Sequence, residues 1–202
     1  MGDHEGLLER LAVAIESSPH NLMSPRGLEE LRSRHLPECV ALAGMLPRGP
    51  GAVVDIGSGG GLPGLVIAIV RPDLEVTLVE ATKKKAAFLR ETGADLGLEV
   101  EVVAERAEDL HDRLGGRFDL ATARAVAPFE RLIPWVMPLL APGGLLYAVK
   151  GERWQEELGA VDLDAVGARI AATPDDLEEA ATNAPRVVII AADGLGTTGE
   201  DA

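Results

Sequence analysis

A short apolar run that leads into a glycine-rich turn and then into a helix constrains this chain more than any other feature. Residues 52–56 (AVVDI) have the pattern of a buried strand, and residues 57–61 (GSGGG) follow at once. Residues 62–70 then have the pattern of a helix, with Pro63 in the first turn, where a missing amide hydrogen costs little. Glycines let the backbone bend sharply and let a ligand lie close, because no Cβ intervenes. We therefore expect a ligand at this turn.

Strands and helices keep alternating after the turn. The pattern predicts strands at 75–79, 100–104, 118–121, 145–149, 168–172 and 186–191, and helices at 83–96, 106–114 and 128–140. Such alternation predicts an α/β fold with a mainly parallel sheet and helices on both faces, to which the late pair of strands adds an antiparallel edge. This combination indicates a Rossmann-like class I S-adenosylmethionine-dependent methyltransferase fold.

The organisation along the chain predicts one methyltransferase domain over residues 1–202. Residues 1–48 have a helical pattern, with a first amphipathic helix near the start and a second stretch at 28–46 that Pro37 interrupts. The Rossmann-like core should span 52–191, after the break at Gly49-Pro50-Gly51. We expect the last residues, 193–202, to be disordered.

The spacing of the glycines separates two kinds of cofactor. A dinucleotide turn has the pattern G-x-G-x-x-G, and counting from Gly57 its third glycine would fall on Leu62. The glycines at 57, 59 and 61 instead give G-x-G-x-G, which suits S-adenosylmethionine because this cofactor has no pyrophosphate to cradle. Glu80 ends the next predicted strand, where a carboxylate can accept hydrogen bonds from both ribose hydroxyls. A solvated strand-end acid is the plainer interpretation of Glu80.

The net charge of −14 taken alone argues against a nucleic-acid partner, but the charge is uneven. Residues 1–150 hold 16 Lys and Arg against 21 Asp and Glu, a net of −5, whereas residues 151–202 hold 3 against 12, a net of −9. A basic surface formed by residues 1–150 therefore remains an alternative. The single cysteine, Cys39, and four scattered histidines indicate a reduced cytoplasmic protein without a metal site. No apolar run is long enough to span a membrane, and the acidic start is untypical of a signal peptide.

At this point the chain resembles the RsmG (GidB) family of bacterial small-subunit ribosomal RNA methyltransferases. The resemblance covers about residues 20–151 and is strongest in DIGSGGGLPG at 55–64, which continues to Arg71-Pro72. The other segments that carry it are Asn21-Leu22, Arg34-His35-Leu36, LVEATKKK at 78–85, Phe88-Leu89, Arg106-Ala107-Glu108, Ala123-Arg124-Ala125 and Val149-Lys150-Gly151.

The resemblance implies transfer of a methyl group from S-adenosylmethionine to N7 of a guanine in 16S ribosomal RNA. It places residues of the cofactor site at Gly57, Leu62, Ala107, Glu108 and Arg124, and with the turn and the strand-end acid we add Ser58, Gly59 and Glu80. It implicates Arg106, Arg124 and Lys150 in activity or in RNA binding. The partner would be 16S ribosomal RNA or the small ribosomal subunit, and we expect a monomer.

The three cations also have an interpretation that does not depend on the family. Arg106, Arg124 and Lys150 follow three predicted strands, so they should lie at one edge of the sheet, where a phosphate-bearing substrate would approach. The alternative is that each is a surface cation paired with a nearby acid. Lys83-Lys84-Lys85 is more typical of a solvated helix start than of an RNA patch.

Alternatives remain open at two further points. Phe129, Trp135 and Trp154 could stack on a flipped base, although packing is the usual role of such residues. The whole chain could be a same-fold methyltransferase acting on a small molecule or another RNA, or a non-catalytic cofactor-binding module. A methyl transfer to guanine N7 needs no general base, since N7 carries a lone pair and no proton, and the sequence offers no obvious acid–base pair.

Overall fold

Seven strands form one sheet in the computed structural model, which describes residues 4–177 and 185–193. The strands are β1 Gly51–Ile56, β2 Leu74–Val79, β3 Val100–Val103, β4 Phe118–Arg124, β5 Leu140–Val149, β6 Ala168–Ala172 and β7 Val187–Ala192. Their order across the sheet is β3-β2-β1-β4-β5-β7-β6. The first five run parallel, whereas β7 pairs antiparallel with β5 and β6 pairs antiparallel with β7. The predicted parallel sheet with an antiparallel edge is confirmed.

The strand order reverses between β1 and β4. The chain builds outward from β1 through β2 to β3, then returns to place β4 on the other side of β1. In open α/β sheets, ligands bind beyond the carboxyl ends of the strands at such a point, because the connections leave in opposite directions and open a crevice. The glycine turn therefore stands at the expected place for a ligand.

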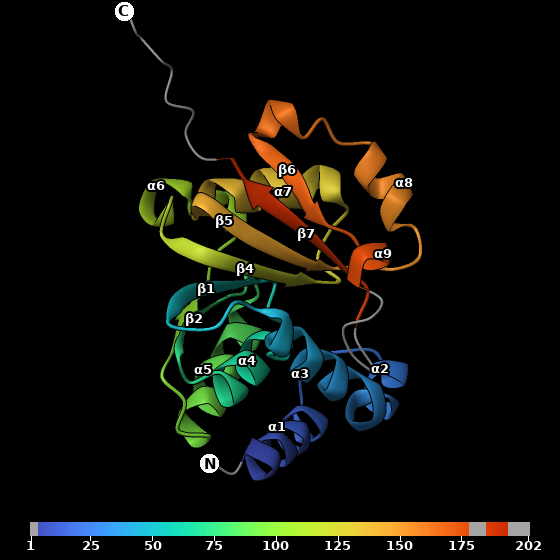
Figure 1. The fold of residues 1–202 in the computed structure, drawn as a ribbon. Coiled ribbons are helices and arrows are strands. Elements are labelled where there is room, and N and C mark those ends of the chain that lie inside the picture. The colour runs from blue at the N-terminus through green and yellow to red at the C-terminus, as the bar shows by residue number, and fades with distance from the viewer. Residues whose placement is uncertain (1–3, 178–184, 194–202) are drawn as a thin grey trace, which may run out of the picture.

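Helices cover both faces of the sheet (Figure 1). One face carries α1 His4–Ser17, α2 Pro25–Glu29, the π-helix η1 Leu31–His35, α3 Leu36–Met45, α4 Gly64–Val70 and α5 Lys83–Asp95. The other carries the short η2 Ala107–Asp109, α6 His111–Leu114, α7 Phe129–Val136, η3 Met137–Leu139 and α8 Trp154–Gly159. Two further short segments, η4 Asp164–Val166 and α9 Pro174–Leu177, flank β6. Within the described residues, no helix combines the length and the apolar character that crossing a membrane requires.

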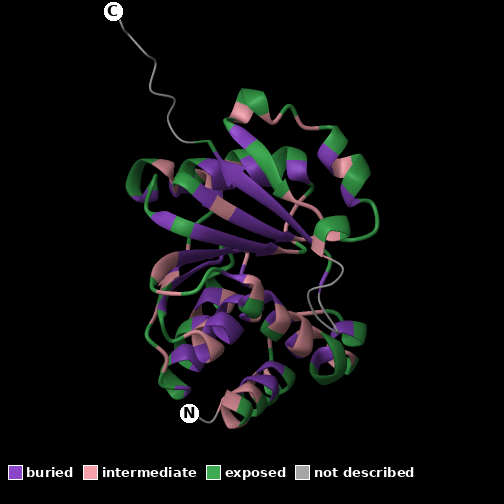
Figure 2. Cartoon of the chain, viewed as in Figure 1, coloured by how far each residue is buried: buried purple, intermediate pink, exposed green. Residues whose placement is uncertain are grey.

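The core consists of two apolar layers, one on each face of the sheet. Successive residues of β1 point to opposite faces, so Val53 packs in the layer beneath α3 and α4 while Val54 packs in the layer beneath α7. The same alternation occurs in β7, where Ile189 and Ile190 join different layers. Strands buried on both faces are continuous apolar runs, which is why these segments are recognisable in the sequence. Figure 2 shows the sheet buried between its helices.

The glycine turn is longer than the sequence predicts. Residues 57–63 form successive turns, with Gly61 N donating to Ser58 O at 2.7 Å, and α4 begins at Gly64 instead of Leu62. Pro63 therefore precedes the helix instead of lying in its first turn. The reason is a long-range hydrogen bond: Gly64 N donates to the buried Asp55 carboxylate at 3.2 Å, which fixes the start of α4 over the end of β1.

The helix predicted over 106–114 is divided into η2 and α6 at Leu110, and two further departures occur at proline-containing segments. The helix expected over 128–140 ends at Val136 and gives way to η3, because Pro138 lacks the amide hydrogen that an α-helix needs. The turn expected at 142–144 is an irregularity inside β5, which pairs with β4 at Leu140 and again from Leu145. The expected tail, 193–202, lies outside the described residues except for Asp193, whose N–H bonds to Gly167 O.

A substitution at Gly64 tests how tightly the turn is packed. A Cβ at this position would lie 2.3 Å from Leu78 Cδ2 and 2.7 Å from Asp55 Oδ2, so Gly64→Ala should lower the free energy of unfolding by about 1–3 kcal/mol. Gly44→Ala in α3 is the matched control, because its Cβ would meet no atom within 4 Å. Urea unfolding should show that the control is neutral or up to about 1 kcal/mol more stable. Equal effects of the two substitutions would contradict this packing.

Candidate active site

The glycine turn is fastened to the end of the neighbouring strand. Gly57 N and Ser58 N both donate to Val79 O of β2, at 2.8 and 3.1 Å. Gly57, Gly59 and Gly61 have φ values of +69°, +54° and +88°, a backbone conformation that costs other L-residues roughly 1–2 kcal/mol each. The turn therefore needs glycine at these three positions for its shape alone, whether or not a ligand lies on it.

Glu80 lies against the glycine turn, as the sequence suggests. Its carboxylate accepts from Gly59 N at 3.0 Å and from Thr82 N at 2.7 Å, and the residue is 7% exposed. The plainer interpretation, a solvated strand-end acid, is wrong. Each carboxylate oxygen has a second acceptor site, so Glu80 can bind these amides and still accept hydrogen bonds from two vicinal hydroxyls.

The residues at the ends of β1, β2 and β3 suit a nucleoside with an amino-acid tail. A Cβ built on Gly59 would meet only Gly57 O, at 3.7 Å, so the backbone there is bare. Leu62 and Ala107 are apolar and nearly buried, and Glu108 follows Ala107 in η2. At Gly57 the backbone instead faces the loop after β4, because a Cβ there would lie 2.8 Å from Val126 Cγ2.

A cavity of about 910 Å³ opens over the carboxyl ends of β4 and β5. Of the residues predicted to hold the cofactor, only Arg124 lines it, and the glycine turn adjoins it through Val126, which lies over Gly57. The walls of the cavity include the loop of residues 125–128, Leu132 of α7, and residues of the N-terminal helices. Four cations and two acids line it: Arg34, Arg124, Lys150, Arg186, Glu38 and Glu157. Of the three cations predicted to gather at one edge, the structure brings Arg124 and Lys150 together here.

Arg124 is held by the N-terminal helices. Its Nη2 donates to His35 Nδ1 and, at 3.1 Å, to Glu38 Oε2, while Nη1 donates to Cys39 Sγ at 3.3 Å. Burial raises the pKa of the Cys39 thiol to about 12, so this sulfur stays protonated and neutral. His35, Glu38 and Cys39 are absent from the site predicted from the sequence. The resemblance did single out Arg34-His35-Leu36, but nothing in the sequence says which strand these residues meet.

Lys150 is a paired, buried cation. Its Nζ donates to Ala127 O at 2.8 Å and to Glu157 Oε2 at 2.7 Å, and it lies 4.1 Å from the centre of the Phe129 ring. With 8% of its side chain exposed, Lys150 fastens the loop after β4 to α7 and α8. Its ammonium group has three donors, two of which these contacts occupy.

Arg106 differs from Arg124 and Lys150 because it is exposed and lies outside the cavity. Its side chain is 67% exposed, it lies 3.9 Å from Glu108, and it does not line the cavity. The aromatic residues do not line the cavity either: Phe129 and Trp154 are buried in the core, and Trp135 packs against Arg131. The packing interpretation of these three residues therefore holds. Lys83 and Lys84 are exposed at the start of α5.

The comparison with known proteins settles the family. Residues 7–169 match the family described as GidB, rRNA small subunit methyltransferase G. The chain belongs to this family. The ribosomal RNA small subunit methyltransferase G of Mycobacterium leprae is 48% identical over 154 residues, which are 70% of this chain and 62% of the relative. The enzyme of the same name from a Nocardioides species is 47% identical over 162 residues, 78% of this chain and 63% of the relative. The chain thus spans less than two thirds of the length of these relatives.

The fold of this family member is shared with more distant methyltransferases. A putative rRNA methylase from Clostridium thermocellum has a similar crystal structure, with a TM-score of 0.56 and 20% identity over 80% of this chain and 97% of that one. At this identity the likeness shows the fold alone, which is that of class I methyltransferases. In the described part of this chain, no group of three or more His, Cys, Asp or Glu side chains is arranged to hold a metal ion.

Asp55 connects the glycine turn of this methyltransferase fold to β4. Its carboxylate is buried and accepts from Gly64 N and, at 2.8 Å, from Thr122 Oγ1. Burial raises the pKa of Asp55 from 3.8 to about 6, against the opposing effect of these hydrogen bonds. The proton is therefore bound more tightly in the folded state than in the unfolded state.

The stability of the chain should depend on pH through this group. Because the folded-state pKa is raised, the contribution of protonated Asp55 is complete below about pH 4 and is lost as pH rises through about 6. Asp55→Asn cannot ionise, so its free energy of unfolding relative to wild type should increase by roughly 1 kcal/mol per pH unit across this window and then level off. Urea unfolding across this window measures the difference. A difference independent of pH would contradict the assignment.

Proposed function

We propose that this chain transfers a methyl group from S-adenosylmethionine to N7 of a guanine in 16S ribosomal RNA. The observation that carries the proposal is the cavity over the carboxyl ends of β4 and β5, with Arg124 and Lys150 in its wall. Its volume of about 910 Å³ is in the range of ligand-binding pockets and admits a flipped nucleotide. Family membership and the names of the relatives at 47–48% identity support the substrate.

In this proposal the turn residues and Glu80 hold the cofactor. The bare backbone at Gly59 and the apolar side chains of Leu62 and Ala107 would contact it, and Glu80 would accept from the ribose hydroxyls. Gly57, Ser58, Glu108 and Arg124 complete the proposed set. When bound, S-adenosylmethionine supplies an electrophilic methyl group on a positively charged sulfur. The chain needs no general base, because guanine N7 has no proton to lose.

The chain's own residues contribute position and charge balance. The loop of residues 125–128 and Leu132 form an apolar wall that shields a base from water and restricts its orientation. Positive charge develops on the guanine ring during transfer, so a bare cation beside the ring would raise the barrier. Arg124 pairs with Glu38 and Lys150 with Glu157, which offsets the charge of these two cations while both side chains keep hydrogen-bond donors.

Labelled methyl transfer tests the reaction directly. Small ribosomal subunits lacking the modification, and their 16S RNA, are incubated with the protein and radiolabelled S-adenosylmethionine. Nuclease digestion and mass spectrometry should then find 7-methylguanosine at one nucleotide. Binding of the cofactor without transfer to either substrate would contradict the proposal. Methylation of a small molecule or of another RNA would show that the substrate is a different one.

Glu80→Gln tests the cofactor site. The amide nitrogen of glutamine cannot accept, so either Gly59 N or Thr82 N loses its acceptor together with one ribose hydroxyl, and the remaining donors keep only a neutral acceptor. We expect S-adenosylhomocysteine to bind about 10- to 100-fold more weakly in calorimetry, the equivalent of one or two charged hydrogen bonds. Glu75→Gln, an exposed change on the same strand, is the control and should bind normally. Unchanged affinity of Glu80→Gln would place the cofactor elsewhere.

Arg106 and Lys150 should behave differently toward RNA. Arg106 is exposed, so Arg106→Ala should weaken RNA binding, reduce the slope of log K against log salt by about 1, and leave the melting temperature unchanged. Lys150→Ala should lower the melting temperature as well, since it leaves Glu157 and Ala127 O without their buried partner. Filter binding and thermal unfolding measure both effects. A melting temperature that falls more in Arg106→Ala would contradict the distinction.

We further propose that the protein is a monomer without a bound metal and that it acts in the cytoplasm, where ribosomal subunits are available. Light scattering on a sizing column and metal analysis of the purified protein test these statements.

A further inference from the structure

The connection between the N-terminal helices departs from α-helical geometry at η1. Both Arg34 N and His35 N donate to Glu30 O, at 2.9 and 3.1 Å, which is the widened pattern of a π-turn. Such turns insert one residue into a helix and occur often at functional sites. Here the widened turn precedes α3, and His35 and Glu38, three residues apart, face the end of β4 together.

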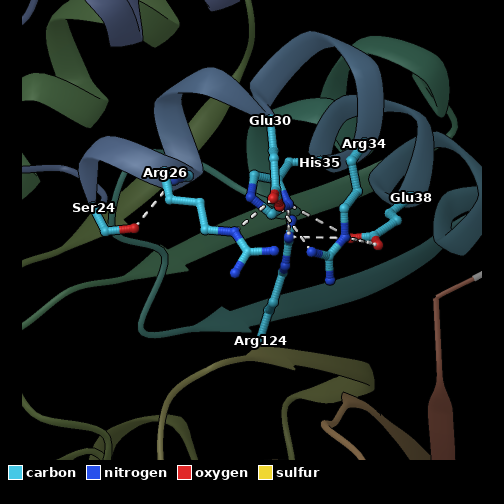
Figure 3. Close-up of polar contacts among 8 residues, drawn as sticks. Ser24, Arg26, Glu30, Arg34, His35, Glu38 and Arg124 are labelled. Atoms are coloured by element: carbon cyan, nitrogen blue, oxygen red, sulfur yellow. Dashed lines mark hydrogen bonds and ion pairs between the residues drawn. The ribbon is translucent and has the colours of Figure 1, made fainter.

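Arg124 reaches these two residues from the sheet. Figure 3 shows Arg124 extending from the strand towards His35, Arg34 and Glu38 of the N-terminal helices. The side chain of Arg124 is 15% exposed, and those of His35 and Glu38 are similarly enclosed. Hydrogen bonds to charged groups out of contact with water are strong and directional. These contacts therefore hold the guanidinium in one place, although its side chain has four rotatable bonds.

The contacts also select which donors of Arg124 stay available. Of its five N–H groups, one on Nη1 and two on Nη2 bond to Cys39, Glu38 and His35. The Nε–H and the second Nη1–H have no partner recorded among the described residues, and Arg124 lines the cavity. Without these contacts the Arg124 side chain would rotate between several conformations, and its donors would not point in one fixed direction.

We propose that His35 and Glu38 are positioning residues, which hold the Arg124 guanidinium against the cavity wall so that its remaining donors face the ligand. The N-terminal helices are then part of the active site as well as a cover for one face of the sheet. The proposal rests on the proposed function for its effect on catalysis, while the positioning itself is a property of the ligand-free protein.

The chemistry of His35 fits this role. Burial and the Arg124 charge lower the pKa of His35, against the opposite effect of Glu38, and Arg34 lowers it further. The ring is thus neutral near pH 7. A neutral ring that accepts at Nδ1 carries its proton on Nε2, so it offers Arg124 an acceptor without a competing charge.

The ion pairs farther from Arg124, among Arg34, Glu30 and Arg26, are more exposed to solvent. Glu38 also accepts from Arg34 Nε at 2.8 Å, Arg34 pairs with Glu30 at 2.8 Å, and Glu30 pairs with Arg26 at 2.7 Å. The Arg26 side chain is 82% exposed, and exposed pairs contribute little. Arg26 does not contact Arg124, which makes it a control within the same cluster.

Nuclear magnetic resonance tests the positioning without cofactor, substrate or activity. With ¹⁵N-labelled histidine, the His35 signals, assigned from their loss in His35→Asn, should show Nδ1 without a proton and Nε2 with one at pH 8. In Arg124→Met, which keeps side-chain length but has no donor or charge, the pKa of His35 should rise because the neighbouring cation is gone. A protonated Nδ1, or an unmoved pKa in Arg124→Met, would overturn the contact.

Kinetics then test its consequence. His35→Leu keeps the bulk but loses the acceptor, and we expect kcat/KM for methyl transfer to fall about 10- to 100-fold. His35→Asn places an amide oxygen near the position of Nδ1 and should restore most of this loss. Glu38→Gln should lower activity as His35→Leu does, whereas the control Arg26→Gln should match wild type. Thermal unfolding of each variant verifies that it is folded.

The outcomes separate the two proposals. Absence of transfer by the wild-type protein, with the His35 signals as expected, would refute the proposed function and leave the positioning standing. Active wild type with full activity in His35→Leu would refute the positioning role. A loss in His35→Leu that His35→Asn does not restore, in a folded protein, would also refute it, because the acceptor would not be the property that matters.

Discussion

The buried carboxylate of Asp55 is the interaction on which the rest of the site depends. It accepts one hydrogen bond from the first residue of α4 and one from Thr122 of β4, so a single side chain fixes the helix start and the strand across the switch point. The glycine turn is held at both ends: Gly64 N bonds to Asp55, and Gly57 N and Ser58 N bond to Val79 O at the end of β2. Two residues after Thr122 comes Arg124, whose place in the cavity wall follows from the same anchor.

The local distribution of charge reconciles an acidic chain with the RNA substrate proposed for it. The net charge of −14 is an average, and around the cavity there is a local excess of cations, four against two acids. Arg124 and Lys150 each have a carboxylate partner within 3.1 Å. Pairing reduces their long-range attraction for polyanions, so under the proposed function an exposed cation such as Arg106 is the predicted phosphate contact.

The loop after β4 joins the two halves of the site. Ala125 has a φ of +54°, a conformation that non-glycine residues seldom adopt, and Lys150 bonds to Ala127 O two residues further on. Between them Val126 lies over Gly57. The loop thus touches the glycine turn on one side and forms the cavity wall on the other.

The sequence by itself determined the strands, the glycine turn and its order relative to Glu80, because these depend on apolar periodicity and on backbone conformations that only glycine adopts readily. The family was indicated by resemblance in DIGSGGGLPG and the segments after it. Glu80 could be placed near the turn because the turn and the acid follow adjacent strands of a known arrangement. The partners of Arg124 and Lys150 were decided only by the tertiary structure. His35 is 89 residues from Arg124 in the chain, and no local pattern encodes which faces meet when a helical layer packs on a sheet. The start of α4 was missed for the same reason, since a carboxylate nine residues away sets it.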